Sequence, residues 1–337
     1  MIRVLGWDVG GANVKAAHVA LERGARSVRT ASRPFEIWRG KEKLPDLLRG
    51  LAADLPPADQ TAVTMTAELS DAFRTKREGV AFVLEAVCAV SPRAPSVFTT
   101  GGEFVDAATA RERPLEVAAS NWMATAMLVA RHAADAILVD VGSTTSDIIP
   151  IRAGRVVAQG RTDPERLLAG ELVYTGALRT TVAAIVPRVP LWGRQCPVAA
   201  ESFAVSGDVH VLLGSLGPDD YTCPTPDGRP ATPSFAAERL ARVVCADIEM
   251  LAHEDVVGIA AAVAEAQVRQ IASAVSRVAA RLERPVNAIV TGQGAFLGHR
   301  AAAQCGLASI ELSSVLGVDV ETAAPAVAVA WLLAERG

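Results

Sequence analysis

Aromatic side chains are scarce in this sequence, and no block of basic residues occurs in it. Of the 337 residues only 4% are Phe, Trp or Tyr, and the formal net charge is −4. Nucleic-acid-binding proteins usually gather Lys and Arg on one face, and single-strand binders add aromatic stacking platforms. The composition therefore argues against nucleic acid and anionic membranes as partners. The alanine-rich run 256–268 contains Glu265 and Gln267, so it is too short and too polar to span a bilayer.

Cysteine is also sparse, and its spacing forms no recognisable site. The five cysteines are scattered, odd in number and without a CxxC pair, which favours reduced thiols in a cytoplasmic protein. The N-terminus enters a hydrophobic strand directly, so we expect no signal peptide. Cys196 and Cys223, taken with Asp208 and His210, match no zinc spacing, so a structural or surface role is favoured. The absence of a Gly-x-Ser-x-Gly elbow disfavours hydrolysis through a covalent nucleophile.

Two aspartate–glycine turns, far apart in the chain, each follow a hydrophobic strand. The first turn places Asp8 before Gly10 and Gly11, and the second places Asp140 before Gly142. Glycine lets the backbone approach a ligand closely, so that N–H groups can surround an anion. An aspartate at such a turn can hold hydrated Mg²⁺, which prefers one or two carboxylates plus phosphate oxygens. Two turns of one design indicate duplicated halves that face one phosphate-containing ligand.

The residues of both turns are the predicted ligands of Mg²⁺ and phosphate. We expect Asp8, Asp140 and Asp147 to be the metal-linked carboxylates. Donors to phosphate are expected from the rest of the two turns: Gly10, Gly11, Asn13, Lys15, Gly142, Ser143, Thr144 and Thr145. Aspartate also favours turns as a simple capping residue, but the match between the turns favours the functional interpretation. For Lys15 a phosphate contact and an exposed strand lysine fit equally well.

The hydrophobic periodicity predicts an α/β protein in which a strand–turn–strand–helix unit occurs twice. Strands are expected at 2–9, 14–21, 61–66, 97–99, 136–141, 147–151, 155–159 and 287–291. Helices are expected at 42–54, 79–91, 120–133, 170–184, 235–252, 258–282 and 323–335. Ser120 is the expected N-cap of its helix. The stretch 187–234 is rich in Pro and Gly, and its Trp192, Phe203 and Tyr221 favour an ordered lid or substrate loop.

Several segments together resemble a known superfamily. The two turns and the segment 290–295 are similar to the phosphate-1, phosphate-2 and adenosine segments of the acetate kinase/sugar kinase/heat-shock chaperone/actin superfamily. More specific segments resemble its hydantoinase/oxoprolinase-related branch: 65–73, 76–80, 121–122, 170–176 and 219–228. Within that branch the chain looks like proteins of tetrahydromethanopterin-linked one-carbon metabolism, which include the archaeal ether synthases of methanofuran biosynthesis. The resemblance covers nearly the whole chain.

This resemblance implies a fold and a reaction. The fold would be a duplicated actin-like (ribonuclease H-like) α/β fold, with domains at 1–133 and 134–322 and the ligand in the cleft between them. The helix at 323–337 would pack back on the first domain. The reaction would be an Mg²⁺-dependent condensation: an aminomethylfuran-methanol diphosphate loses diphosphate, and the phenol oxygen of a tyramine or tyrosine unit takes its place.

The resemblance also assigns roles to individual residues. It implies catalytic roles for Glu68, Lys76, Asp140 and Asp147. A carboxylate such as Glu68 is a candidate for the general base of the phenol or for the group that holds the furan's ammonium. Implied substrate contacts are Asp71, Arg77, Asn121 and Glu171, and implied phosphate contacts are Gly292, Gln293 and Gly294. Ordinary surface charges at a helix start account equally well for Asp71 and Arg77.

The third glycine segment departs from the superfamily pattern, and this departure affects whether ATP or a smaller diphosphate is the expected ligand. Related proteins commonly have Gly-Gly-x-Gly there, whereas this chain has Gly292-Gln293-Gly294. A side chain at Gln293 disfavours adenosine and suits a smaller diphosphate ligand. An ATP-dependent small-molecule kinase or hydantoinase/oxoprolinase-like ATPase is one alternative, and a non-catalytic nucleotide-binding scaffold is another. The apolar content and the helix at 258–282 are compatible with a homodimer.

Overall fold

The computed structural model describes residues 2–22, 25–282, 286–320 and 323–336. The chain divides into two compact units, each assembled from separate stretches of sequence. Unit 1 comprises residues 1–138, 149–171 and 310–337, and unit 2 comprises residues 139–148 and 172–309. No helix among the described residues is long and apolar enough to cross a membrane.

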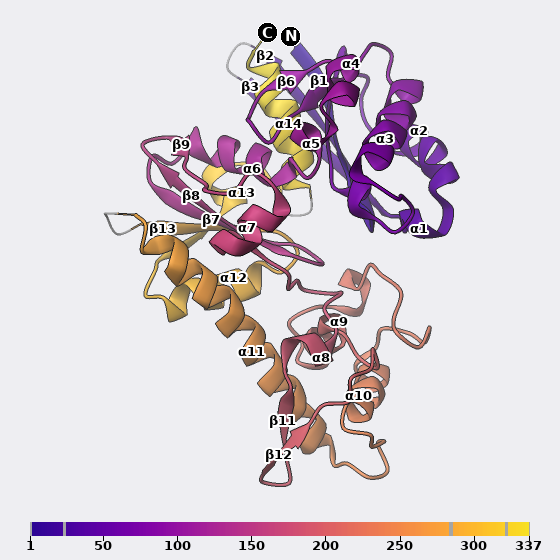
Figure 1. Ribbon diagram of the computed structural model, residues 1–337, viewed down its shortest axis with the longest axis vertical. Coiled ribbons are helices and arrows are strands. Elements are labelled where there is room, and N and C mark those ends of the chain that lie inside the picture. Colours follow the sequence, from indigo (N-terminus) through magenta and orange to yellow (C-terminus); the bar gives the residue numbers. More distant parts are fainter. Residues whose placement is uncertain (1, 23–24, 283–285, 321–322, 337) are drawn as a thin grey trace. The chain divides into compact units, whose positions relative to one another are not determined.

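A six-stranded sheet organises unit 1 (Figure 1). Its strands, in the order β3-β2-β1-β4-β5-β6, are β3 (Ala25–Pro34), β2 (Asn13–Glu22), β1 (Ile2–Val9), β4 (Gln60–Met65), β5 (Ser96–Phe98) and β6 (Phe104–Val105). The first three strands form an antiparallel meander, whereas β4 pairs parallel to β1 and β5 pairs parallel to β4. Parallel neighbours end at the same edge of a sheet, so the segments that follow β1 and β4 meet there.

Helices cover both faces of this sheet. Successive side chains of a strand point to opposite faces, and the strands carry apolar side chains on both. Trp7 and Val9 of β1 share a hydrophobic cluster with Leu48 and Val80, whereas Gly6, which precedes Trp7, packs against the backbone of Ala326. The helices of unit 1 are α1 (Ile37–Gly40), α2 (Leu44–Ala53), α3 (Lys76–Val90), α4 (Ala107–Glu112), α5 (Pro114–Val117), α6 (Asn121–Ala130), α7 (Asp163–Ala169), α13 (Leu312–Leu316) and α14 (Ala324–Ala334). The almost wholly buried α14 packs on β1, β2 and α6.

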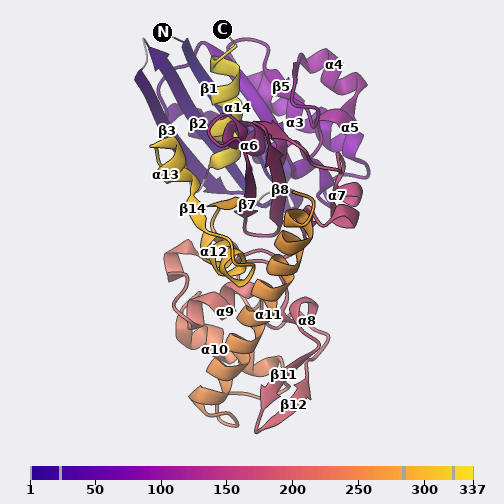
Figure 2. The same cartoon turned by 90° about the vertical axis from the view of Figure 1, so that its left-hand side faces the viewer.

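A second sheet has the order β10-β8-β7-β13-β14, with β9 paired to β8. Its strands are β7 (Ala136–Val141), β8 (Ser146–Arg152), β9 (Arg155–Val156), β10 (Leu172–Val173), β13 (Asn287–Thr291) and β14 (Ser309–Glu311). The strands of this sheet are divided between the two units, and the helices of unit 2 are α8 (Val182–Ile185), α9 (Ser206–Leu212), α10 (Pro233–Arg242), α11 (His253–Ala279) and α12 (Ala295–Gln304). The hairpin of β11 (Arg188–Leu191) and β12 (Arg194–Pro197) packs with α8, α9 and α10 along the long α11 (Figure 2).

Most of the predicted strands are confirmed, and β7 has the predicted bounds. The helix expected at 170–184 is wrong: Gly170 ends α7 with φ of 72°, and β10 and the short α8 follow. The helix expected at 235–252 begins as α10 but ends at Arg242, and the strand expected at 155–159 is only β9. The stretch 187–234, expected to be a loop, holds a hairpin and α9.

Ser120 occupies the predicted N-cap position of α6, but its side chain does not cap the helix. Its hydroxyl donates to the carbonyl of Phe98 at 3.0 Å and lies 2.8 Å from the Thr64 hydroxyl. Because Ser120 and Thr64 are fully buried, these contacts satisfy two hydroxyls that would otherwise lack partners. Ser120 therefore ties the start of α6 to β4 and β5.

Candidate active site

The first turn, at residues 10–13 in unit 1, has its carbonyl groups occupied by protein. The Gly10 N–H donates to the carbonyl of Asn13 at 3.0 Å, which closes the turn. The carbonyls of Gly11 and Ala12 accept N–H groups from the segment that leads into α1. Within the described residues, the N–H groups of Gly11 and Ala12 have no such partner. The turn therefore offers donors to a ligand, as an anion site requires.

Asp8 and Lys15 lie directly opposite each other on β1 and β2, beside this turn. The Asp8 side chain is almost fully buried, and its Oδ2 lies 3.5 Å from the Lys15 ammonium. Lys15 is thus not simply an exposed strand lysine. Its charge is placed next to the turn and partly balances a buried carboxylate.

The second turn, at residues 142–145 in unit 2, repeats this design. The Gly142 N–H donates to the carbonyl of Thr145 at 2.9 Å. The carbonyl of Gly142 accepts from Ala177, and that of Ser143 accepts from two successive N–H groups, at 178 and 179. In the described part of the chain, the N–H groups of Ser143 and Thr144 donate to no partner. Both turns, predicted from sequence, thus direct their carbonyls into the protein and leave N–H groups available.

The third glycine segment packs against the strand that enters the second turn. The Gly294 N–H donates to the carbonyl of Val141 at 2.8 Å. Gly292 has φ of 91°, and a Cβ there would lie 2.5 Å from Oδ1 of Asp140. Only glycine allows this approach without strain. The side-chain amide of Gln293 donates to the backbone carbonyl of Asp220.

Asp140 and Asp147 lie on the adjacent strands β7 and β8 of this sheet. Asp140 is half-buried and Asp147 is buried. A half-buried carboxylate beside turn hydroxyls suits a hydrated Mg²⁺ that takes its other ligands from water and phosphate. Among the described residues, no three His, Cys, Asp or Glu side chains gather into an all-protein metal cage.

A buried chain of hydrogen bonds supports the second turn from α11. The amide nitrogen of Gln267 donates to the Thr175 hydroxyl at 2.9 Å and to the carbonyl of Gly176 at 2.7 Å. Its amide oxygen lies 2.9 Å from Nε2 of His210. Burial lowers the pKa of His210 to about 4, so the ring is neutral and its Nε2–H can donate to Gln267. Nothing in the sequence indicated this chain of hydrogen bonds. It holds residues 175–176, and the N–H groups that follow them, at 177–179, donate to the carbonyls of the second turn.

Glu68 lies on the short 3-10 helix η2 (Ala67–Leu69), directly after β4 and against the first turn. A Cβ on Gly11 would lie 3.9 Å from the Cα of Ala67. The side chain of Glu68 is only 1% exposed, and α3 packs so tightly on it that a Cβ on Gly79 would come within 2.5 Å of its Cα. Within the described residues, no donor meets either carboxylate oxygen in good hydrogen-bond geometry, although the backbone N–H groups of Glu68 and Ala119 are near enough to favour its ionised form.

Burial dominates the electrostatics of Glu68. Desolvation raises the pKa of its carboxyl from 4.5 to about 7, although Lys76 and the backbone N–H groups of Glu68 and Ala119 oppose the rise. The Lys76 ammonium lies 3.9 Å from Oε1 of Glu68 and donates to Oδ2 of Asp163 at 2.9 Å. A carboxylate with a pKa near neutrality can take up a proton during a reaction at physiological pH. Asp163, which the sequence did not indicate, joins this group from α7.

The other sequence-predicted substrate residues have different surroundings. Both carboxylate oxygens of the fully buried Glu171 accept backbone N–H groups, from Gln159 at 2.8 Å and from Gly160 at 3.0 Å. This carboxylate therefore holds the backbone at Gln159 and Gly160, and its contact with substrate stays a prediction. Asp71 and Arg77 are exposed, and neither joins the Glu68 group. Asn121 is half-buried at the first position of α6.

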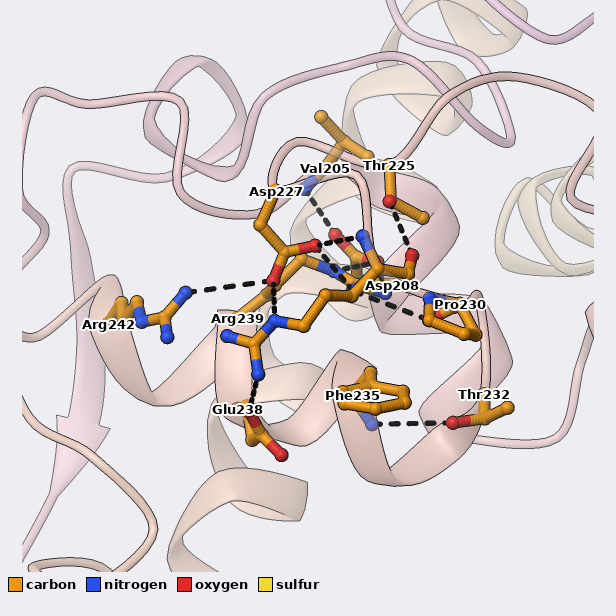
Figure 3. Close-up of polar contacts among 11 residues, drawn as sticks. Val205, Asp208, Thr225, Asp227, Pro230, Thr232, Phe235, Glu238, Arg239 and Arg242 are labelled. Carbon is orange, nitrogen blue, oxygen red and sulfur yellow. Dashed lines mark hydrogen bonds and ion pairs between the residues drawn. The ribbon is translucent and has the colours of Figure 1, made fainter.

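The loop 219–228 is fixed to unit 2 by a buried ion-pair network (Figure 3). Arg239, fully buried on α10, donates to Asp208 at 2.8 Å and to Asp227 at 3.0 Å. Burial raises the pKa of Asp208 and of Tyr221, whose ring packs against Gly207. Asp208 is therefore paired with an arginine, which agrees with the structural role favoured from sequence.

A family model and two curated relatives match the chain. The model of the hydantoinase/oxoprolinase family matches residues 59–336. The chain belongs to the hydantoinase/oxoprolinase family. It is 35% identical, over 99% of its length and 98% of the relative's, to the (4-{4-[2-(gamma-L-glutamylamino)ethyl]phenoxymethyl}furan-2-yl)methanamine synthase of Methanocaldococcus jannaschii. The synthase of the same name from Methanococcus vannielii is 33% identical over 58% of this chain and 90% of that protein.

A solved structure supports the fold of this family member. The nucleotide-free structure of acetone carboxylase matches with a TM-score of 0.52 and 12% identity, covering 91% of this chain and 67% of that one. The family member has the actin-like α/β fold that the sequence predicts.

Proposed function

We propose that this protein is an ether synthase of methanofuran-type cofactor biosynthesis. It would join [5-(aminomethyl)furan-3-yl]methyl diphosphate to the phenol oxygen of a tyramine or tyrosine unit. The two relatives, 35% and 33% identical to the chain over the aligned residues, are named for the product of such a coupling. The observation that carries the proposal is the nearly inaccessible Glu68, which lies next to the first turn with a pKa of about 7.

The reaction exchanges one bond to carbon for another. The C–O bond between the furan methylene and the diphosphate breaks, and its electron pair leaves with the diphosphate. A lone pair of the phenol oxygen forms the new C–O bond, and the phenolic proton moves to a base. The furan ring stabilises positive charge on the methylene, so the protein chiefly has to bind the leaving diphosphate and remove one proton.

Glu68 is the base that we propose for that proton. A phenol has an ordinary pKa near 10, and the phenol becomes more acidic as its oxygen bonds to carbon. An ionised Glu68 with a pKa of about 7 is a stronger base than an exposed carboxylate, and it is still largely ionised slightly above neutral pH. The Lys76 ammonium, 3.9 Å from Oε1, stabilises the ionised form of Glu68 but is too far away to form a direct hydrogen bond that would weaken it as a base.

Each turn is a proposed phosphate-binding element of its own unit. Available N–H groups, at Gly11 and Ala12 in unit 1 and at Ser143 and Thr144 in unit 2, would stabilise negative charge on phosphate oxygens. Asp140 would hold Mg²⁺, which supplies further charge neutralisation when bound. Gln293 stands where related proteins commonly have glycine, and its side chain donates to the carbonyl of Asp220. A side chain at this position favours a diphosphate over a nucleotide.

Ether formation with matched variants tests this function. The full-length protein is incubated with the furanmethyl diphosphate, Mg²⁺ and either tyramine or γ-glutamyltyramine, and the ether and free diphosphate are quantified. Wild type is expected to form both in equal amounts. Glu68→Gln should lower kcat by about 10²- to 10⁴-fold, the usual contribution of a general base.

The control is Glu85→Gln, which removes an exposed carboxylate from α3 and should leave the rate within about twofold. Full activity of Glu68→Gln would overturn the assignment of the base. Hydrolysis of ATP with no ether formed would overturn the function itself.

A further inference from the structure

Asp163 lies between two cations and contacts each with a different oxygen. Its Oδ2 accepts a hydrogen bond from Lys76 at 2.9 Å, and its Oδ1 lies 3.7 Å from a terminal nitrogen of Arg166. Arg166 is almost fully buried, and its guanidinium stands 4.4 Å from the centre of the Trp122 ring. Because Arg166 is held by burial and by the Trp122 ring, its contact with Oδ1 restricts rotation of the Asp163 carboxylate away from Lys76.

The start of α7 is held in place by local contacts. Thr162 and Glu165 form a capping box, in which the Glu165 carboxylate accepts the N–H groups of Arg161 and Thr162, both at 2.9 Å. Pro164 occupies the first turn, where its fixed φ favours helix. Asp163 is the first residue of this helix, so the capping box fixes its position relative to Glu165.

Lys76 therefore has two carboxylates within reach and contacts only one closely. Its ammonium is 2.9 Å from Asp163 and 3.9 Å from Glu68. The charged groups that face Glu68 are Lys76 from α3 and Asp163 from α7, with Arg166 behind Asp163. Because Glu68 is buried, a movement of about 1 Å that brought the Lys76 ammonium into direct contact with its carboxylate would strongly stabilise the ionised form of Glu68.

From these distances we infer that Asp163 is a positioning residue, which holds the Lys76 ammonium away from Glu68 and so preserves Glu68 as an effective base. This inference rests on the proposed function, in which Glu68 takes the phenolic proton. Asp163 has no contact with the reacting atoms in this account. It acts only through the position of Lys76 and through its own negative charge, which also disfavours the ionised form of Glu68.

Two substitutions should displace the pKa of Glu68 in opposite directions. In Asp163→Asn, Lys76 keeps a single carboxylate partner and pairs directly with Glu68, so the pKa of Glu68 should fall by about 1 pH unit or more. In Lys76→Met the cation that favours the ionised form of Glu68 is removed, and the pKa should rise above about 7. A loss of structure alone would expose Glu68 and lower its pKa in both variants. Asp163→Glu, which keeps the charge, should restore behaviour close to wild type.

The test is a carbon-13 NMR titration of protein labelled at the glutamate carboxyl carbons. Glu68→Gln identifies the Glu68 signal, and Glu85→Gln serves as the charge-matched control with no expected change. Opposite displacements in Asp163→Asn and Lys76→Met support the inference. An unchanged Glu68 titration in Asp163→Asn, or displacements of the same sign, overturns it.

A second readout keeps this inference separate from the proposed function. The pH dependence of kcat/KM for ether formation should show its acidic limb moved to lower pH in Asp163→Asn, with kcat at pH about 8 reduced roughly tenfold. If the NMR displacements appear but no ether forms with any protein, the positioning role stands and the proposed function fails. If ether forms but the NMR signal of Glu68 does not respond, the positioning role fails alone.

Discussion

The substitution Glu68→Gln should make the protein more stable above neutral pH while it removes activity. The pKa of Glu68 rises from 4.5 to about 7 on folding. Between these values the folded chain keeps a proton that the unfolded chain has lost. The stabilisation is therefore complete below about pH 4.5 and is lost as the pH rises through about 7. A difference of about 2.5 pH units corresponds to roughly 3 kcal/mol.

Glutamine resembles the protonated carboxyl in shape and does not titrate. The free energy of unfolding of Glu68→Gln, relative to wild type, should therefore rise by about 3 kcal/mol between pH about 4 and about 8. Urea unfolding followed by tryptophan fluorescence suits the measurement, because four of the five tryptophans lie in unit 1: Trp7, Trp38, Trp122 and Trp331. Glu85→Gln is the control. Parallel pH profiles for wild type and Glu68→Gln would show that Glu68 titrates normally and would refute the reasoning.

Three further substitutions test the supports of the turns. Gly292→Ala should weaken diphosphate binding by about tenfold or more in calorimetry, because the added Cβ would collide with Asp140. The control is Gly306→Ala, where φ is 70° and the surroundings are open. It should lower the free energy of unfolding by about 1 kcal/mol and leave binding unchanged. Gln267→Leu should raise KM for the diphosphate substrate more than it lowers kcat, since it releases the segment that holds the second turn. Arg239→Leu should cost about 3–5 kcal/mol in urea unfolding, and a second change, Asp208→Leu, should recover most of it.

Local patterns allowed the strands and turns to be predicted from sequence. β7 and its turn follow from a short apolar run that ends in Asp and Gly, and these signals lie within ten residues. Glu68 and Lys76 could be assigned to the site because the neighbouring segments 65–73 and 76–80 both carry the family resemblance. In each case the residues that determine the structure are neighbours in the chain.

The remaining parts of the candidate site depend on contacts between distant residues. Asp163 meets Lys76 across 87 positions, and Gln267 meets Gly176 across 91. The segment expected as a helix at 170–184 instead donates N–H groups from Ala177 and Leu178 to the carbonyls of the second turn. Those hydrogen bonds replace helical ones, so tertiary structure overrides local propensity there.

The source of the ether oxygen tests the central claim most directly. Tyramine labelled with oxygen-18 at the phenol is incubated with the furanmethyl diphosphate, Mg²⁺ and wild-type protein. Mass spectrometry then locates the label in the ether and in the diphosphate. The ether is expected to retain the label, and the released diphosphate is expected to carry none. Unlabelled ether, labelled diphosphate, or tyramine phosphate in place of ether would contradict the proposed attack of the phenol oxygen on carbon.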